Sequence, residues 1–134
     1  MASYHFHLTQ VKRSRGQSVI AQAAYRSGEK LYSTYYGESS DFTRKRGVVM
    51  AEICLPDHAP REYADRETLW NALEWAESGR KAQLAHSFDI TLMNEFSMEE
   101  NIEMARAFVQ EELVSRGMIA DFAIHDKGNG NPHA

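Results

Sequence analysis

The sequence predicts one two-layer α+β domain, and three observations lead to that prediction. A chain of 134 residues with 43% hydrophobic and 25% charged residues has the composition of an ordinary globular domain. This length buries roughly two-thirds of the surface of the unfolded chain, which is enough for a core without cross-links. Strand and helix periodicities alternate along the chain without an internal repeat or a dividing linker. Disorder, collagen and coiled-coil arrays are therefore excluded, and residues 1–134 form one domain.

The first half of the chain alternates between strand and helix signals. Residues 3–9 have strand periodicity, with an apolar face of Tyr4, Phe6 and Leu8. Ser18 is suited to cap a helix that ends near Gly28. Residues 31–47 are rich in Tyr, Ser and Gly and are expected to form a mobile loop or an irregular hairpin. A second strand follows over residues 48–55.

The second half repeats this alternation. A helix is expected to begin at Asp65 and end near Gly79, with apolar residues spaced for burial at Leu69, Trp70, Leu73 and Trp75. A strand follows over residues 83–93. Ser97 and Glu100 have the spacing of a capping box, which predicts a long amphipathic helix that stops at Gly117. The last strand is expected over residues 118–125.

Charge and cysteine content restrict the possible functions. Residues 1–50 carry a net charge of +5 and the remainder −9, so the first third is suited to face phosphate groups although the whole chain is acidic. Cys54 is the single cysteine, so an internal disulfide is excluded and a cytoplasmic location is expected. No run of ten apolar residues occurs, so we expect no membrane segment.

Several histidines lie on predicted strands in which apolar and polar residues alternate clearly. If the first, middle and last strands are neighbours, His5, His7, Asp89 and His125 share one sheet face opposite the helices. A solvated polar face is the simpler interpretation of each histidine taken alone. His125 and His133 flank a Gly/Asn-rich turn, so a hairpin would bring two imidazoles together as ligands for a divalent ion.

Several motifs together resemble the N-terminal relaxase domain of the MobA/MobL family. They are Tyr4-His5-Phe6, Gly16-Gln17-Ser18, Ala23-Ala24-Tyr25-Arg26-Ser27-Gly28, Leu55-Pro56, 65–71, 81–85, 117–121, and His125-Asp126 followed by Asn131-Pro132-His133-Ala134. The family comprises MobQ-class plasmid relaxases of the HUH endonuclease superfamily. The resemblance covers essentially the whole chain in order. It implies an RRM-like antiparallel sheet with helices on one face and the active site on the other.

The resemblance also implies an activity and its residues. Relaxases nick one DNA strand at an origin of transfer through a tyrosine that forms a 5′-phosphotyrosyl link, and Tyr25 matches that tyrosine. His125 and His133 match two of the three histidines that hold a divalent metal ion, with Mn²⁺ or Mg²⁺ expected first and Zn²⁺ or Ni²⁺ as alternatives. The partner is single-stranded DNA, with accessory relaxosome proteins as further partners.

Two departures from the family are visible. The third histidine would fall just beyond Ala134, so a relaxase domain incomplete at its C-terminus is expected. The family tends to place a glutamate where this chain has Ser87, so Asp89 is the expected substitute as a base or metal contact.

Three functions remain open from the sequence. The first is a metal-dependent nickase, with the phosphates of the DNA bound by Arg13, Arg15, Arg26, Arg44, Lys45 and Arg46 and its bases stacked on Tyr32, Tyr35 and Tyr36. The second is a catalytically silent fragment that binds single-stranded DNA. The third is an unrelated small metal-binding domain.

Overall fold

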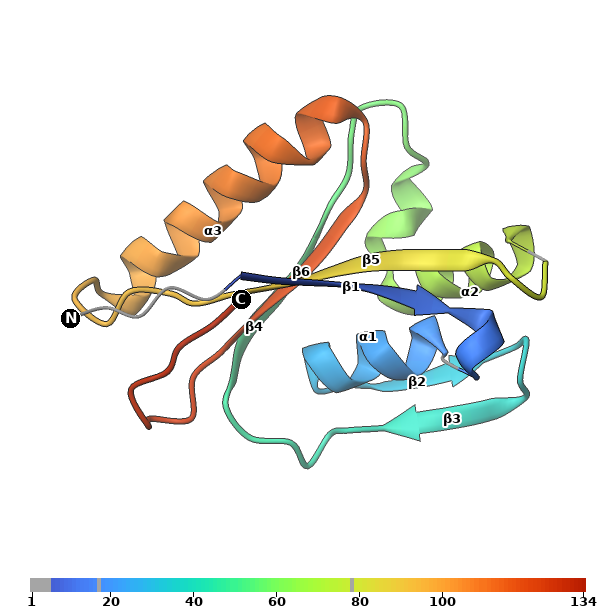
Figure 1. Ribbon diagram of the computed structural model, residues 1–134, viewed down its shortest axis with the longest axis horizontal. Helices are drawn as coiled ribbons and strands as arrows, with labels where there is room; N and C mark the ends of the chain where they lie inside the picture. Colours follow the sequence, from blue (N-terminus) through green and yellow to red (C-terminus); the bar gives the residue numbers. More distant parts are fainter. Residues whose placement is uncertain (1–5, 17, 78) are drawn as a thin grey trace.

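The computed structural model describes residues 6–16, 18–77 and 79–134 and has an antiparallel α+β fold (Figure 1). Tyr4, His5 and Gln17, which the motifs above include, lie outside the described residues. The strands are β1 (Phe6–Lys12), β2 (Lys30–Ser33), β3 (Glu38–Asp41), β4 (Val48–Cys54), β5 (Gln83–Ile90) and β6 (Ala120–His125). The helices are α1 (Val19–Ser27), α2 (Arg66–Ala76) and α3 (Met98–Glu112), with short 3-10 turns at Arg13–Arg15, Arg61–Ala64 and Val114–Arg116.

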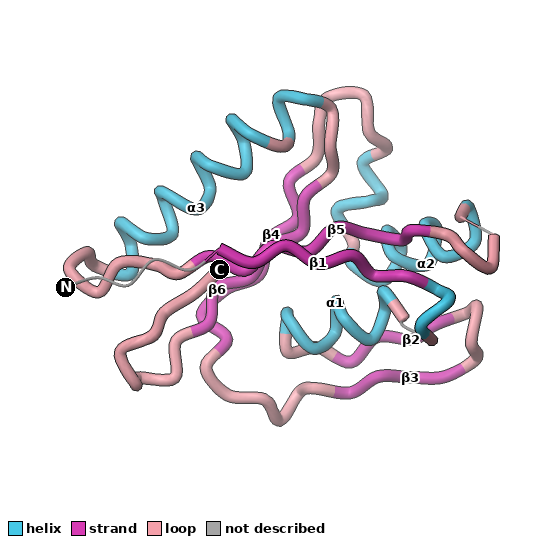
Figure 2. The backbone as a smooth tube through the Cα atoms, viewed as in Figure 1, coloured by secondary structure: helices cyan, strands magenta, loops and turns pink. Residues whose placement is uncertain are grey.

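Residues 132–134 join two strand pairs into one sheet. β1 pairs antiparallel with β5, and β4 pairs antiparallel with β6. Ala134 exchanges both backbone hydrogen bonds with Ile90, while His133 exchanges both with His125. The spatial order is therefore β1, β5, 132–134, β6 and β4, and Figure 2 shows the strand pairs converging near the C-terminus.

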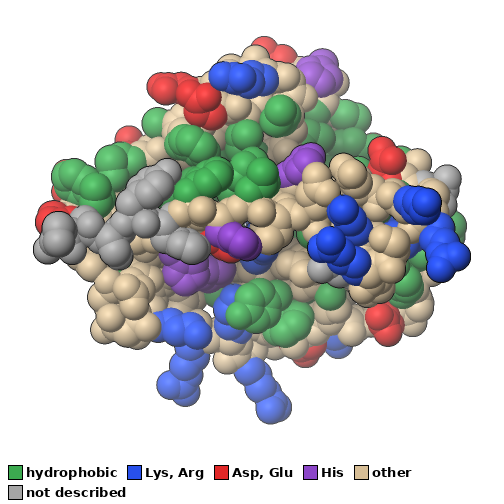
Figure 3. All heavy atoms as spheres, in the orientation of Figure 1, with side chains coloured by type: hydrophobic (Ala, Val, Ile, Leu, Met, Phe, Trp, Pro, Cys, Tyr) green, Lys and Arg blue, Asp and Glu red, His purple; other side chains and the backbone are tan. Residues whose placement is uncertain are grey.

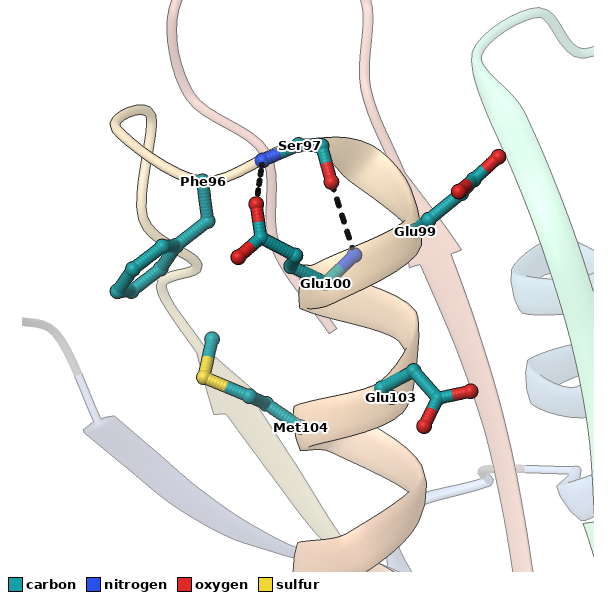
Figure 4. A pocket seen from close by; sticks show the side chains of 6 residues that line it. All are labelled: Phe96, Ser97, Glu99, Glu100, Glu103 and Met104. Atoms are coloured by element: carbon teal, nitrogen blue, oxygen red, sulfur yellow. Dashed lines mark hydrogen bonds between the residues drawn. The ribbon is translucent and has the colours of Figure 1, made fainter.

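The expected helix caps are present. Ser18 accepts a hydrogen bond from the backbone N–H of Ala21, and α1 ends at Gly28 with a left-handed φ of 70°. Asp65 caps α2 in the same manner, by accepting from Thr68. Ser97 and Glu100 form the reciprocal capping box at the start of α3, as Figure 4 shows. The hollow in that figure contains none of the expected site residues.

The two faces of β6 contact different helices. Phe122 and Ile124 pack in clusters with Ala105 and Val109 of α3. Asp121, on the opposite face, binds side chains of α2, and α1 also contacts β6. The antiparallel α+β prediction is confirmed, but helices cover both faces of this strand, because its polar residues bind α1 and α2 while its apolar residues contact α3.

Two apolar side chains of β1 are more exposed than their pattern predicts. Phe6 is 44% and Leu8 51% exposed, while Val11, on the opposite face, is buried against Val19 of α1. His7 and Val11 lie on the same face of β1, and this face contacts α1 at the Val11 end of the strand. Trp75 is also 58% exposed despite its helical spacing. Within the described residues, no helix combines the length and the apolar character that a membrane span needs.

Candidate metal centre and tyrosine site

A histidine pair lies at the centre of the sheet. The chain turns back after β6, and His133 returns directly opposite His125 as an antiparallel partner. The Nδ1 atom of His125 lies 3.3 Å from the Nε2 atom of His133, and the ring centroids are 5.0 Å apart. The expectation that a hairpin brings these two imidazoles together is confirmed.

Backbone carbonyls determine which ring nitrogens are protonated. The Nε2 atom of His125 lies 2.8 Å from the carbonyl oxygen of Arg26, and the Nδ1 atom of His133 lies 3.2 Å from that of Asn131. A carbonyl only accepts, so both of these nitrogens carry the proton of a neutral ring. Burial lowers the pKa of His125, which favours the neutral ring. The two unprotonated nitrogens therefore face each other.

This arrangement suits a shared cation. Two lone pairs that face each other repel unless a proton or a metal ion lies between them. Two nitrogen ligands at the usual Zn–N distance of about 2.0–2.1 Å are about 2.9 Å apart at a right angle and about 3.3–3.4 Å apart at the tetrahedral angle. The separation of 3.3 Å falls within this range. The backbone carbonyls that hold the other ring nitrogens are the usual support of histidine ligands.

Further polar residues share this face of the sheet. Thr91 lies opposite His133, Asp89 is two residues before Thr91 on the same strand face, and His7 lies opposite Asp89. His7, Asp89 and the histidine pair therefore line one face, as predicted, although His5 lies outside the described residues. The Oγ atom of Ser87, on the same face, is buried and has no hydrogen-bond partner. However, α1 covers this face near His125, which is only 9% exposed, so the face is not fully open.

Tyr25 lies on the last full turn of α1, directly before Arg26. The hydrogen bond from His125 to the Arg26 carbonyl therefore attaches this helical turn to the histidine pair. The Tyr25 side chain is 50% exposed, and its ring packs perpendicular to that of Phe42 at a centroid distance of 5.3 Å. The Nζ atom of Lys45 lies 3.5 Å from the ring centroid of Tyr25. The helical turn that carries this half-exposed tyrosine is thus attached to the candidate metal centre.

Positive charges surround the histidine pair. Lys127 and Arg26 lower the pKa of Lys45 by repulsion, in addition to the larger effect of burial. Lys45 and Arg26 also disfavour protonation of His125. In Figure 3, histidine side chains gather near the middle of the visible face, with Lys and Arg side chains next to them. Arg15, Arg44 and Arg46 are exposed. This charge suits an anionic ligand such as phosphate.

Arg13 has a different environment from the other expected DNA contacts. Its side chain is 9% exposed and binds Glu74, which is fully buried, at 2.9 Å. It also donates to backbone carbonyls of Glu74, Glu77 and Gly79, and it stacks over the ring of Tyr35. Arg13 thus fixes α2 to the rest of the fold, which corrects the expectation that it contacts phosphate.

Sequence reasoning missed two charged residues near these sites. Lys127 follows His125 by two residues and was not singled out, although its place in the turn between the two histidines was a usable signal. Glu74 accepts a hydrogen bond from the backbone of Val19 at the start of α1. This contact joins residues far apart in the sequence, and the helical periodicity of α2 alone gave no indication of it.

The fold is that of the relaxase class that the sequence motifs suggested. The chain belongs to the MobA/MobL family, because the profile of that family matches residues 17–134. This result confirms the resemblance described above.

Individual relatives agree with the family assignment. The chain is 36% identical to a probable mobilization protein MobA of Bifidobacterium longum over 100% of its own length and 24% of that protein. It is 38% identical to the conjugal transfer protein TraA of Rhizobium radiobacter, over 99% of this chain and 13% of that protein. A chain solved in work on the molecular basis of vancomycin resistance transfer in Staphylococcus aureus has a TM-score of 0.92 and 37% identity, over 98% of this chain and 67% of that one.

Proposed function

We propose that this chain carries out strand-specific DNA nicking at a plasmid origin of transfer, as the relaxase step of mobilisation. Tyr25 is the nucleophile, and His125 and His133 hold a divalent cation. The observation that carries the proposal is the 3.3 Å separation of two imidazole nitrogens, one from each histidine, in a pair that is attached through Arg26 to the helical turn of Tyr25. Relatives named for mobilization and conjugal transfer support the same role.

The proposed reaction is a transesterification. The phenol oxygen of Tyr25 attacks the phosphorus of one phosphodiester and loses its proton to a nearby base. The bond between phosphorus and the 3′ oxygen breaks, and that oxygen takes up a proton to leave as a free 3′-hydroxyl. The products are a 5′-phosphotyrosyl link and a nicked strand, so the phosphodiester count is unchanged and religation needs no added energy source.

Each part of the site has a role in this reaction. A divalent ion on His125 and His133, with Mn²⁺ or Mg²⁺ as first candidates and Zn²⁺ or Ni²⁺ as alternatives, would offset the charge on the phosphoryl oxygens. Asp89 lies on the same sheet face and is the candidate base or additional ligand. Arg26 and Lys127 supply positive charge beside the phosphate, and the exposed Arg15, Arg44 and Arg46 extend it along single-stranded DNA.

The proposal is tested with labelled single-stranded oligonucleotides that tile the transfer origin of the replicon carrying the gene. Each is incubated with Mn²⁺ or Mg²⁺ and analysed by denaturing electrophoresis. We expect a covalent protein–DNA adduct that disappears in Tyr25→Phe and persists in Tyr63→Phe, a matched change at a tyrosine remote in sequence. An adduct that survives in Tyr25→Phe would contradict the assignment of the nucleophile.

A second function is favoured by the small ligand set. Among the described residues, no group of three or more His, Cys, Asp and Glu side chains is placed to hold a metal ion. Two histidines alone would leave most coordination positions to water or substrate. A protein that binds single-stranded DNA without cutting it is the corresponding alternative. It predicts binding of the oligonucleotide in a native gel-shift measurement, with no adduct in the denaturing gel and no effect of the divalent ion.

A further inference from the structure

A short turn holds Tyr25 from two sides. The backbone N–H of Lys45 donates to the carbonyl of Phe42, which closes a turn over residues 42–45. Asp41 accepts hydrogen bonds from the backbone and the hydroxyl of Thr43, so the turn has a single preferred shape. As a result, Phe42 packs perpendicular to the Tyr25 ring while Lys45 lies over the face of that ring.

Lys45 makes two contacts with Tyr25 at once. Its Nζ atom donates a hydrogen bond of 2.7 Å to the backbone carbonyl of Tyr25 and lies 3.5 Å from the centroid of the ring. An ammonium over an aromatic face is an attractive electrostatic contact. The carbonyl belongs to the last turn of α1, where helical carbonyls lack partners and a positive charge is favourable. The two contacts therefore fix the ammonium and the ring relative to each other.

The same segment continues to the histidine hairpin. Gly47 accepts a hydrogen bond of 2.8 Å from the backbone of Asp126, which directly follows His125. A Cβ atom at Gly47 would lie 2.9 Å from the Cγ atom of Lys127. The segment 42–47 thus contacts Tyr25 at one end and the hairpin of the histidine pair at the other.

We propose that Lys45 is a positioning residue that holds the Tyr25 ring in one orientation toward the histidine pair, instead of a contact for DNA phosphate. This inference rests on the proposed function of Tyr25 as nucleophile. A tyrosine that is half exposed samples several rotamers unless neighbouring groups restrain it. Small misplacements of a reacting group reduce rates strongly, so restraint of the ring favours the attack.

The test compares Lys45→Met, which keeps the aliphatic stem, with Lys45→Arg, which keeps the charge. Lys81→Met is the matched control, because Lys81 is exposed in the turn before β5 and lies outside segment 42–47 and its partners. The first measurement is NMR of the tyrosine rings in the protein alone. We expect the Tyr25 ring signals to move in Lys45→Met and to stay close to wild type in Lys45→Arg and Lys81→Met. Unchanged Tyr25 signals in Lys45→Met would overturn the inference.

The second measurement separates binding from reaction. At saturating single-stranded oligonucleotide, we expect Lys45→Met to slow adduct formation by at least about tenfold with the Kd for the oligonucleotide changed less than about twofold. Lys45→Arg should restore most of the rate. A weaker Kd with an unchanged rate at saturation would instead identify Lys45 as a phosphate contact. If the wild type forms no adduct, the proposed function fails, and the NMR comparison alone still decides the role of Lys45.

Discussion

Asp121 and His125 lie on the same face of β6, four residues apart, and their surroundings differ. Asp121 accepts two hydrogen bonds of 2.8 Å from Arg66 and one of 2.9 Å from Trp70. His125 and His133 bring two ring nitrogens within 3.3 Å of each other, and the other nitrogen of each ring faces a carbonyl oxygen, so the facing pair consists of two acceptors. Asp121 and His125 are both largely buried. Where every polar atom has a complementary partner, the group serves stability. Where two acceptors face each other, the arrangement is incomplete without a cation, which indicates function.

The largest expected effect on stability comes from removing the Asp121 carboxylate, which binds Arg66 and Trp70. Asp121→Ala removes the acceptor of Trp70 and leaves Arg66, which is 11% exposed, with Glu29 as its one carboxylate partner among the described residues. Loss of one member of a buried ion pair lowers the free energy of unfolding by about 3–5 kcal/mol. Urea unfolding measures this change. Glu112→Ala, which breaks the exposed pair with Arg116, is the control and should change stability by less than about 0.5 kcal/mol. Equal effects of the two substitutions would contradict the comparison.

Binding of a divalent ion by His125 and His133 should stabilise the folded protein. A divalent ion at about 100 times its Kd raises the free energy of unfolding by about 2.7 kcal/mol if it binds only the folded chain. We expect this increase for wild type with Mn²⁺ and its loss in His133→Ala. The same increase in both proteins would place the ion elsewhere.

The contact between segment 42–47 and the histidine hairpin can be tested at Gly47. This residue has φ of 87°, and an added Cβ would approach Lys127 to 2.9 Å. Gly47→Ala should therefore destabilise the protein by about 1–3 kcal/mol and weaken Mn²⁺ binding. Gly37 has a comparable φ of 67°, but no atom lies within 4 Å of an added Cβ. Gly37→Ala should therefore lower the stability through backbone strain alone and leave Mn²⁺ binding unchanged. Identical Mn²⁺ affinities in the two variants would show that the contact of Gly47 with the hairpin does not support metal binding.

The smallest expected effect is a dependence of stability on pH. The pKa of His125 in the folded protein is lowered from 6.5, mainly by burial. Below pH 6.5 the unfolded chain therefore takes up a proton that the folded chain does not. Without added metal, the free energy of unfolding should fall as the pH decreases through this range, by at most about 1.4 kcal/mol per unit. His125→Gln should lose this contribution in urea unfolding curves measured between pH 5 and 8. If the free energy of unfolding changes with pH at the same slope in wild type and His125→Gln, other groups cause the pH dependence.

Local sequence signals predicted the elements and the histidine pair well. Ser18, Gly28, Asp65 and the Ser97–Glu100 pair act through neighbouring residues, so their caps were visible in the sequence. His125 and His133 are separated by only eight residues, and the turn between them determines their pairing. Their placement could therefore be predicted from the sequence.

Long-range contacts were not visible in the sequence. Arg13 had the appearance of a solvent-exposed basic residue, but its partner Glu74 lies 61 residues away. The roles of Phe6 and Leu8 depend on which face of β1 meets α1, and Val11 determines that face through Val19. Lys45 was expected to contact DNA, and its contacts with Tyr25 depend on the turn over residues 42–45. Each case depends on packing between elements, which periodicity alone does not specify.

The most direct test of the account is ¹⁵N NMR of the histidine rings with and without Zn²⁺, a diamagnetic probe of the site. The account predicts that, in the metal-free protein, the proton of His125 is on Nε2 and that of His133 on Nδ1. Addition of Zn²⁺ should then shift the signals of His125 Nδ1 and His133 Nε2 together, with one ion bound. Protonation at either of these two facing nitrogens in the neutral rings, or signals that do not respond to Zn²⁺, would contradict a metal centre at this pair.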